Sequence, residues 1–459
     1  MWYPGELDMT NHSSEAKAFY KMAFALIMPM ALQNLINVGI SSIDVLMLGK
    51  VSETVLSAAS LASQVQFIIT LIFFGLTSGA AVLTAQYWGK RDKDSIIKVM
   101  GICMRFSLTV AIFFTLAVAV FPAQIMNIFT NEEPVIIEGV KYLRIVSLSY
   151  IFMSITMIYL NIMRSVERVV VSTVVYLISL ISNVIIAALL IFGLFGLPKL
   201  GIQGSAIATL ASRGLELIVV IVYALKYNDV LPFKPSSLLV RDKYLFRDFL
   251  YYSIPVTLNE LMWGCGVAMN AVVIGHLGTP VVSANSVAQI TRQLATVIAF
   301  GLANATAVSV GKVIGENDLN SAKTYANRFI KLSILAGISG GILILIARPV
   351  TMSVLNLTPV TQSYLSVMMY VMSYFSIAQA INTTLVVGVF RAGGDTRFGL
   401  LLDTTTMWCG SILFGALAAF VFKWSIPIVY MILMSDEIIK IPFTVLRFKS
   451  RKWLNNVTR

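Results

Sequence analysis

The sequence predicts an all-α polytopic membrane protein with about twelve transmembrane helices, in two six-helix lobes related by an internal parallel repeat. The composition is the first observation: 58% of the residues are hydrophobic and 12% are charged, and the mean hydropathy is +0.83. These values exclude a soluble globular protein. The second observation is a series of apolar runs of about 20 residues, the length that crosses a bilayer as a helix. The third is a duplication within the chain.

The duplication is visible as a constant offset along the sequence. Segment 29–95 aligns with segment 255–321 without a gap, so that Pro29 aligns with Pro255 and Gly49 with Gly275. The aligned segments end in the loops GKRDKDS and GENDLNS. Farther along, Arg164 aligns with Arg391 after the offset has grown by one position. Duplicated membrane helices are typical of secondary transporters, in which the substrate path lies between the two halves.

Each predicted span is one apolar run, and the two halves contain six spans each. In chain order we expect them at 22–48, 57–86, 99–121, 140–163, 170–195, 202–226, 249–275, 284–311, 326–347, 362–389, 398–421 and 425–446. Because each half contains an even number of spans, both halves enter the membrane in the same orientation. The axis that relates them should therefore run along the membrane normal.

The formal net charge is +12, and its placement indicates a membrane topology instead of a nucleic-acid partner. Lys and Arg concentrate in the loops after even-numbered spans and in the stretch 227–247, whereas the opposite loops contain few cations. By the positive-inside rule, both termini are cytoplasmic in a multi-pass protein of the cell membrane. We expect an N-terminal lobe at 1–226, a cytoplasmic linker at 227–247 and a C-terminal lobe at 248–459.

Cysteine and histidine argue against several kinds of site. Cys103, Cys265 and Cys409 are scattered without paired spacing, which argues against a disulfide framework or a zinc site. Two histidines cannot build a metal cluster. The sequence also lacks a nucleotide-binding loop and a catalytic constellation. We expect no cofactor and no enzymatic activity.

Polar residues recur at helical spacing inside the predicted spans. Gln33, Asn37 and Asp44 share one face of the first span, and Gln289 and Arg292 share one face of the eighth. Polar groups are costly in hydrocarbon, so these faces should point to protein or water. The alternative is that they join helices by hydrogen bonds. The residues that we expect to line a water-filled substrate cavity are Gln33, Asn37, Gln64, Asn270, Gln289, Arg292, Tyr370, Tyr374 and Asn382.

Three carboxylates lie within predicted spans: Asp44 in the first, Glu260 in the seventh and Asp403 in the eleventh. A carboxylate inside a membrane can exchange a proton, or bind sodium when amide and carbonyl oxygens surround it. Both chemistries suit ion-coupled transport. We expect ion coupling at these residues, and candidate sodium ligands are Asp44, or Glu260 with Asp403. The alternative is a structural pair with a nearby arginine, or a hydrogen bond to Ser or Asn.

Two prolines lie within predicted spans, where they can bend a helix. Pro29 and Pro255 occupy equivalent positions in spans one and seven, where a proline removes a backbone hydrogen bond and allows a kink. Bending there would open and close the cavity, and a static kink is the alternative.

Ion pairs at spacings of three and four are expected within spans six and twelve. Their members are Arg213 with Glu216, and Asp436 and Glu437 with Lys440.

Several segments resemble the multidrug and toxic compound extrusion (MATE) family, bacterial type. They are the first span with its aspartate (PMALQNLINVGISSIDVLMLG, 29–49), the loops GKRDKDS and GENDLNS, and FRAGGDTR at 390–397. The similarity extends from about residue 17 to residue 453. It implies a V-shaped exporter of two six-helix lobes, in which inward flow of sodium or protons drives drug efflux.

The resemblance also implies roles for residues of the N-terminal lobe. Asp44 matches the acidic residue of span one that is implicated in cation coupling, and Asn183 matches its partner in span five. Some members carry a second Asp one turn later in span five. This chain has Ala187 there, which departs from a two-aspartate proton relay.

In the C-terminal lobe, other members carry a Glu in span seven and an Asp in span ten. Glu260 supplies the first, although it lies nearer to the proline than in those members. The position of the second is Ala380 in this chain. Asp403 on the neighbouring span is the expected substitute.

The leading interpretation is an antiporter that exports organic, multidrug-type cations in exchange for protons or sodium ions by alternating access. A flippase for a lipid-linked saccharide or peptidoglycan precursor is the alternative, and it should show extra spans or a strongly cationic cavity. A channel would conduct in single-channel recordings, and an enzyme would need a catalytic constellation. The expected partners are a small organic substrate and membrane lipids, without nucleic acid, and we expect a monomer.

Overall fold

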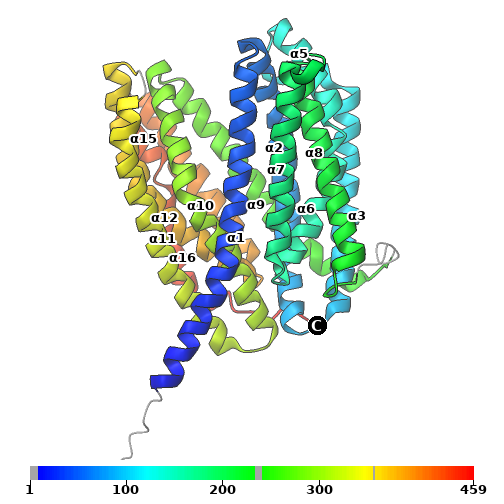
Figure 1. Cartoon of the computed structure of the whole chain (residues 1–459). Helices are drawn as coiled ribbons and strands as arrows, with labels where there is room; N and C mark the ends of the chain where they lie inside the picture. The colour runs from blue at the N-terminus through cyan, green and yellow to red at the C-terminus, as the bar shows by residue number, and fades with distance from the viewer. Residues whose placement is uncertain (1–8, 233–239, 355–356) are drawn as a thin grey trace, which may run out of the picture.

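The computed structural model describes residues 9–232, 240–354 and 357–459, and every regular element within them is a helix (Figure 1). Most helices run roughly parallel along one direction, as expected for apolar spans. The predicted linker 227–247 includes 233–239, which lie outside the described residues. Asp242, inside this predicted linker, caps the next helix, which already begins at Lys243. Its carboxylate accepts hydrogen bonds from the main-chain N–H groups of Tyr244 and Leu245, both at 3.1 Å.

The N-lobe consists of the helices α1 to α8. Their bounds are α1 Met9–Gly49, α2 Glu53–Gly89, α3 Lys93–Val120, α4 Pro122–Phe129, α5 Glu133–Val146, α6 Ser149–Ser165, α7 Val169–Phe192 and α8 Ile202–Val222. A short 3-10 turn, η1 Leu194–Gly196, follows α7, and a π turn, η2 Tyr223–Tyr227, extends α8. The extra helix α4 is short and lies between the third and fourth expected spans.

The C-lobe consists of α9 to α16. Its bounds are α9 Lys243–Gly275, α10 Thr279–Gly315, α11 Leu319–Val354, α12 Pro359–Thr383 with η4 Thr384–Phe390, α13 Thr396–Thr404, η5 Thr405–Ile412, α14 Leu413–Ala416, η6 Leu417–Val421, α15 Ile426–Leu433 and α16 Asp436–Lys449. The segments from α13 to η6 together form one span, Thr396–Val421.

Eleven of the twelve expected spans are long and apolar enough to cross a membrane. Ten are single helices of the described residues, and the eleventh is the pair α5 and α6, which bend by 51° at their junction. The twelfth expected span, 425–446, is divided into α15 and α16, of 8 and 14 residues. The break precedes Asp436 and Glu437, where the apolar run of α15 gives way to charged side chains.

The loops that join α2 to α3 and α10 to α11 have the same conformation. Arg91 and Asn317, which occupy matching positions of the repeat, have positive φ angles of 62° and 63°. The next residue in each loop caps the following helix: the Asp92 carboxylate accepts from Ser95 N–H, and the Asp318 carboxylate accepts from Ser321 N–H, both at 3.0 Å. The two halves of the sequence repeat therefore have the same backbone conformation in these loops.

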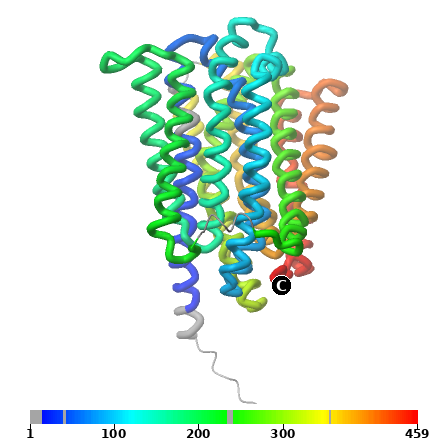
Figure 2. Tube along the Cα trace, turned by 90° about the vertical axis from the view of Figure 1, so that its right-hand side faces the viewer, coloured from blue at the N-terminus to red at the C-terminus, as the bar shows by residue number. Residues whose placement is uncertain are grey.

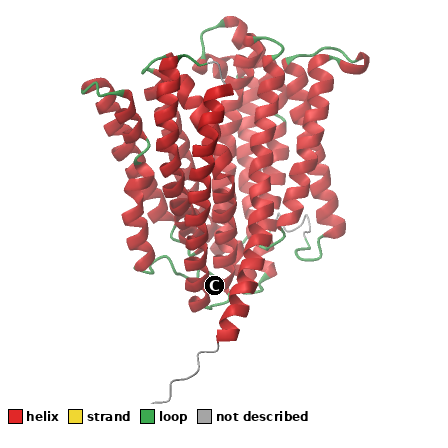
Figure 3. Cartoon of the chain, turned by 60° about the vertical axis from the view of Figure 1, so that its left-hand side comes forward, coloured by secondary structure: helices red, strands yellow, loops and turns green. Residues whose placement is uncertain are grey.

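The two lobes meet at the end of the bundle where α2 and α10 finish, which we call the basic end because Lys90, Arg91 and Lys312 lie there. α2 packs on α9 so closely that a Cβ on Gly79 would lie 2.3 Å from Ser253 Cα. Toward the opposite end, the C-lobe helices α11, α12 and α15 lean away from the N-lobe (Figure 1). The bundle also widens toward that end in the view of Figure 3.

Side chains of both lobes and the last residues of the chain form contacts that join the lobes at the basic end. Gln86 of α2 donates to the Ala392 carbonyl of the C-lobe at 2.7 Å and accepts from Val457 N–H at 2.7 Å. Lys312 of α10 forms an ion pair with Glu167 of the N-lobe at 2.8 Å. α1 begins and the chain finishes at this same end (Figure 2).

Candidate functional site

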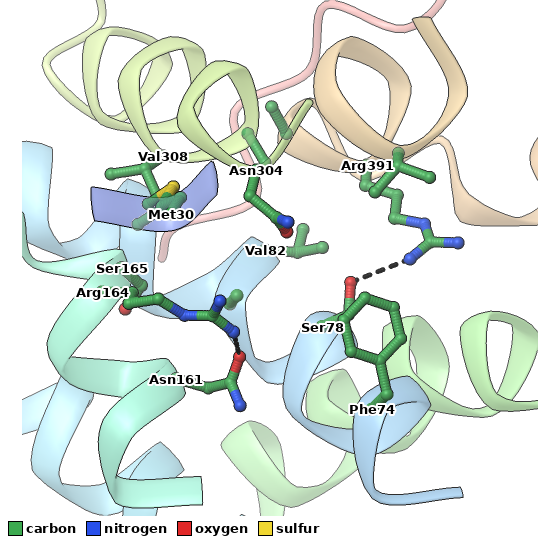
Figure 4. Close-up of a pocket in the computed structure, with 15 residues that line it drawn as sticks. Met30, Phe74, Ser78, Val82, Asn161, Arg164, Ser165, Asn304, Val308 and Arg391 are labelled. Carbon is green, nitrogen blue, oxygen red and sulfur yellow. Dashed lines mark hydrogen bonds between the residues drawn. The ribbon is translucent and has the colours of Figure 1, made fainter. Parts of the chain in front are cut away.

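A pocket lies between the lobes, next to the basic end, with walls from α1, α2 and α6 of the N-lobe and from α10 and the end of η4 in the C-lobe (Figure 4). Its cavity volume is about 40 Å³. Apolar side chains such as Met30, Phe74 and Val308 form most of its wall. Its polar lining consists of Ser78, Asn161, Arg164, Ser165, Asn304 and Arg391.

Arg391 reaches this pocket from the C-lobe and is neutralised there. Its guanidinium forms an ion pair with Glu260 of α9 at 2.7 Å and donates to the Ser78 hydroxyl of the N-lobe at 3.0 Å. The side chains of Arg391 and Glu260 are only 5% and 12% exposed. The alternative expected for Glu260, a pair with a nearby arginine, is therefore the arrangement in the structure.

Arg164 reaches the pocket from the N-lobe and has neutral partners. It donates to the side-chain oxygens of Asn161 and, at 3.4 Å, of Gln33. Among the described residues, no carboxylate lies within ion-pair distance of it. Gln33 in turn donates to the Thr173 hydroxyl at 2.8 Å and is 2% exposed. Within the described part of the chain, the ion pairs thus include none that neutralises Arg164, and its guanidinium donates to neutral amide oxygens.

Lys440 stands at the centre of a buried charge cluster in the C-lobe. Its ammonium lies 3.1 Å from Asp403, 3.4 Å from Asp436 and 3.1 Å from Glu437, and its side chain is 4% exposed. The ion pairs predicted within α16 are confirmed, as is the pair of Arg213 with Glu216 at 2.8 Å. Asp403, an expected ion-coupling residue from another helix, joins them.

Amide and hydroxyl groups complete this cluster. Asn259 donates to the Asp403 carboxylate at 3.0 Å. Asn382 donates to the Glu437 carboxylate at 2.8 Å and accepts from the Thr444 hydroxyl at 3.0 Å. The structure therefore places Asn382, an expected cavity residue, inside the cluster, where it is 2% exposed. Lys440 thus offsets one of the three carboxylate charges, and amide and hydroxyl groups supply further hydrogen bonds to this buried cluster.

Asp44 and Asn183 differ from the carboxylates of the C-lobe because their oxygens are unpaired. Asp44 Oδ1 and Asn183 Oδ1 are both buried, and neither has a hydrogen-bond partner among the described residues. Asp44 lies on α1 and Asn183 on α7, and these two helices pack against each other. Ala187, one turn after Asn183, is fully buried.

The remaining expected cavity residues occupy several environments. Asn37 and Gln64 are exposed, and Asn270 is half-buried with its Oδ1 unpartnered among the described residues. Arg292 donates to Gln289 at 3.0 Å and to Gln379 of α12 at 2.9 Å. Tyr374 is half-buried and Tyr370 is exposed beneath the guanidinium of Arg348, 4.6 Å from its ring centre.

Pro29 and Pro255 both lie inside continuous helices, α1 and α9. Thr173 of α7 donates to the Pro29 carbonyl at 3.3 Å, so the neighbouring helix engages the backbone at this site. The role of the two prolines as hinges remains a prediction.

The sequence did not identify Ser78, Arg164, Asn304 and Arg391 as pocket residues. The signal that could have found them is their position in the repeat, in which Ser78 aligns with Asn304 and Arg164 aligns with Arg391. These two matched pairs face the same pocket from the two lobes. The sequence analysis used the arginines only to trace the repeat.

Comparison with known proteins decides the family. The profile of the family described as MatE matches residues 29–189 and again residues 255–407. The chain belongs to the MATE family. Its two matches begin at Pro29 and Pro255, the offset found within the sequence, and together they cover most of the chain. MATE proteins are transporters, so this chain is a multi-pass membrane transporter with a fold of duplicated helices.

Curated relatives are named as drug-resistance proteins. The probable multidrug resistance protein YoeA of Bacillus subtilis (strain 168) is 24% identical over 353 residues, covering 76% of this chain and 75% of the relative. A probable multidrug resistance protein NorM of Bacillus cereus (strain ATCC 14579) is 23% identical over 425 residues, covering 91% and 92%. The family relationship supports transport of the multidrug type.

Solved structures share the fold of this MATE protein. A MOP superfamily transporter from Pyrococcus furiosus, whose binding pocket is described as having reverse polarity, matches with a TM-score of 0.85 and 17% identity over 94% of this chain and 95% of that chain. A multidrug resistance MATE family transporter in an outward-facing conformation matches with a TM-score of 0.85 and 17% identity over 94% and 96%.

Proposed function

We propose that this MATE protein is a secondary antiporter that exports organic, multidrug-type compounds in exchange for protons or sodium ions by alternating access. The observation that supports it most strongly is the pair of unpartnered buried oxygens on Asp44 and Asn183. Unsatisfied acceptors inside a protein are costly, and a bound cation or proton satisfies them.

The N-lobe is the proposed place of ion coupling. Asp44 and Asn183 supply a carboxylate and an amide oxygen, which are ligands that suit sodium, and the carboxylate alone suits a proton. Glu260 and Asp403 have Arg391 and Lys440 within ion-pair distance. A cation would have to displace those partners, so these two carboxylates are second candidates.

The closed basic end suggests how access would alternate. We propose that this end faces the cytoplasm, because the Lys and Arg residues concentrate there. The contacts of Gln86, and of Lys312 with Glu167, then close the inner side while the outer halves of the lobes are apart. Release of these contacts would open the inner side, with bending at Pro29 and Pro255.

The side chains expected between the two lobes indicate the proposed substrate class. Exposed polar side chains, Asn37 and Gln64, and aromatic groups such as Trp263 and Tyr374 would contact amphipathic organic compounds. Aromatic faces also attract organic cations. We propose that the protein works in the cell membrane as a monomer surrounded by lipid, and that it requires no cofactor.

Transport by the purified protein tests this proposal. In proteoliposomes, an imposed proton or sodium gradient should drive movement of a fluorescent organic dye. Asp44→Asn keeps the side-chain shape and removes the charge, so gradient-driven transport should be lost while the protein still inserts. Glu53→Gln is the matched control, because Glu53 is exposed at the start of α2. Unchanged coupled transport in Asp44→Asn would overturn coupling at this residue.

A further inference from the structure

The pocket between the lobes is built from matching positions of the two repeats. Ser78 and Asn304 face it from α2 and α10, and Arg164 and Arg391 face it from the ends of α6 and η4 (Figure 4). Ala81 and Val82 of α2 likewise match Ala307 and Val308 of α10 in the pocket wall. The pocket therefore lies on the axis that relates the lobes, and each lobe contributes one arginine to it.

The charges of the two arginines are not balanced in the same way. Glu260 neutralises Arg391, and the repeat position that matches Glu260 is Asn34 in the N-lobe. A neutral amide thus stands where the N-lobe would need a carboxylate for Arg164. The pocket retains one net positive charge, and a buried charge without a counterion is costly in a membrane protein.

We propose that this pocket binds an oxyanion, namely a carboxylate or phosphate group, between Arg164 and Arg391. A guanidinium presents a fork of N–H donors that matches these groups in geometry and charge. The Ser78 hydroxyl, which accepts from Arg391, still has its own hydrogen to donate. The ligand would supply the charge that Asn34 does not.

The size of the pocket limits what enters it. A volume of about 40 Å³ holds about three water-sized groups, which suits an anionic head group and not a whole drug-sized molecule. The oxyanion would belong either to the transported compound or to a lipid. In the first case the proposal rests on the proposed export function. The rest of such a molecule would extend into the space between the lobes.

Binding on the axis also favours one arrangement of the lobes. An anion that contacts Arg164 and Arg391 together holds the N-lobe and C-lobe close at the basic end. When the lobes separate there, the two arginines move apart and the shared site is lost. The ligand therefore stabilises the arrangement seen here, because it binds the two arrangements unequally.

Cysteine protection tests the site without any transport measurement. In a protein that lacks Cys103, Cys265 and Cys409, Asn304→Cys places a thiol in the pocket wall, and its rate of reaction with N-ethylmaleimide reports access. In phosphatidylcholine nanodiscs, inorganic phosphate that replaces chloride at constant ionic strength should slow the reaction. Phosphatidylglycerol nanodiscs without phosphate are the second arm, in which slowing would identify a lipid head group as the oxyanion.

Arg164→Gln should raise the half-protecting phosphate concentration, or weaken the lipid effect, about tenfold or more, as expected for one lost charged hydrogen bond. Arg164→Lys keeps the charge and should raise it less, which covers the case in which Arg164→Gln does not fold. Arg168→Gln is the matched control, because this exposed arginine follows Arg164 by four residues and lies outside the pocket. Protection should be unchanged in this control.

The proposal is overturned if neither phosphate nor phosphatidylglycerol slows the reaction, or if Arg164→Gln and Arg164→Lys are both protected as well as the parent. Asp44→Asn should retain full protection because the assay needs no ion gradient. Loss of ion-driven transport and loss of anion binding are therefore separate results.

Discussion

Gly89 of α2 and Gly315 of α10 make the same contact from opposite lobes. A Cβ on Gly89 would lie 1.9 Å from the Lys312 carbonyl oxygen, and a Cβ on Gly315 would lie 1.9 Å from the Gln86 carbonyl oxygen. The two glycines occupy matching positions of the repeat, and so do Gln86 and Lys312. The helices thus cross at the basic end in a reciprocal contact that only glycine permits.

This contact predicts the effect of a single methyl group. Alanine is favoured over glycine in a helix by about 1 kcal/mol, but at Gly315 its methyl group would meet a backbone oxygen that cannot move alone. We expect Gly315→Ala to destabilise the protein by about 1–3 kcal/mol through overpacking, and to weaken closure of the basic end. Thermal unfolding in detergent measures the first effect.

Gly275→Ala is the control for this substitution. Gly275 also lies in a helix, at the end of α9, and a Cβ there would have nothing within 4 Å. Its melting temperature should be equal to the parent or slightly higher. A Gly315→Ala protein that melts like Gly275→Ala would show that the crossing is looser than the structure indicates.

The ion pair of Glu260 with Arg391 predicts a large interaction energy. Glu260→Gln leaves Arg391 buried without a carboxylate, which should cost about 3–5 kcal/mol. Arg391→Gln should be harmful for the converse reason, while the double variant should cost less than the sum of both. A double-mutant cycle of unfolding free energies measures the difference.

The surface pair of Lys141 with Glu138 provides a matched cycle. Its members are 43% and 24% exposed and lie 2.5 Å apart, and an exposed pair of this kind contributes about 0–1 kcal/mol. If the interaction energy of Glu260 with Arg391 is no larger than this, the buried pair does not hold the C-lobe together.

The fold was predictable from the sequence because its evidence is local or repeated. Apolar length locates the spans, and the offset from Pro29 to Pro255 gives the two lobes. The division of the last span was missed because a run of apolar residues in α15 reads on into Ile438 and Ile439, while Asp436 turns inward to Lys440.

The candidate site was predictable only in part because helical spacing gives a face but not its neighbours. Asp44 and Asn382 both lie on polar faces, yet Asp44 has an unpartnered oxygen and Asn382 binds Glu437. The contact of Lys440 with Asp403 depends on how α16 and α13 are rotated against each other, which spacing within either helix does not report. In the same way, the spacing within α6 or η4 does not report that Arg164 and Arg391 line one pocket.

The cap of α11 predicts a dependence of stability on pH. The Ser321 hydroxyl and main-chain N–H bind the Asp318 carboxylate and hold its pKa below its usual value. A lowered pKa in the folded state means that the carboxylate stabilises the protein above its unfolded pKa, and that this contribution is lost as pH falls through the folded pKa. Asp318→Ala should cost about 1 kcal/mol near neutral pH.

The difference between the parent and Asp318→Ala should shrink as the pH is lowered below about 4, the usual range of an aspartate. Melting temperatures of both proteins across this range provide the measurement. Asp318→Asn is the control, because asparagine caps a helix without a charge and should show a smaller dependence on pH. A constant difference at all pH values would mean that the charge of Asp318 does not contribute.

The cluster around Lys440 predicts a second strongly destabilising substitution in the C-lobe. Lys440→Met leaves Asp403, Asp436 and Glu437 close together, with no other cation within ion-pair distance among the described residues. Loss of a buried counterion should cost about 3–5 kcal/mol. Lys449→Met, in the same helix at an exposed position, should have little effect.

Rescue distinguishes this electrostatic cause from lost packing. Asp403→Asn removes one of the three negative charges and keeps a polar group for Asn259 to contact, so it should restore part of the stability of Lys440→Met. Lower pH should do the same, because protonation of the carboxylates removes their repulsion. Thermal unfolding of the single and double variants measures both effects. If neither Asp403→Asn nor lower pH raises the melting temperature of Lys440→Met, the lysine stabilises the C-lobe by packing and not by its charge.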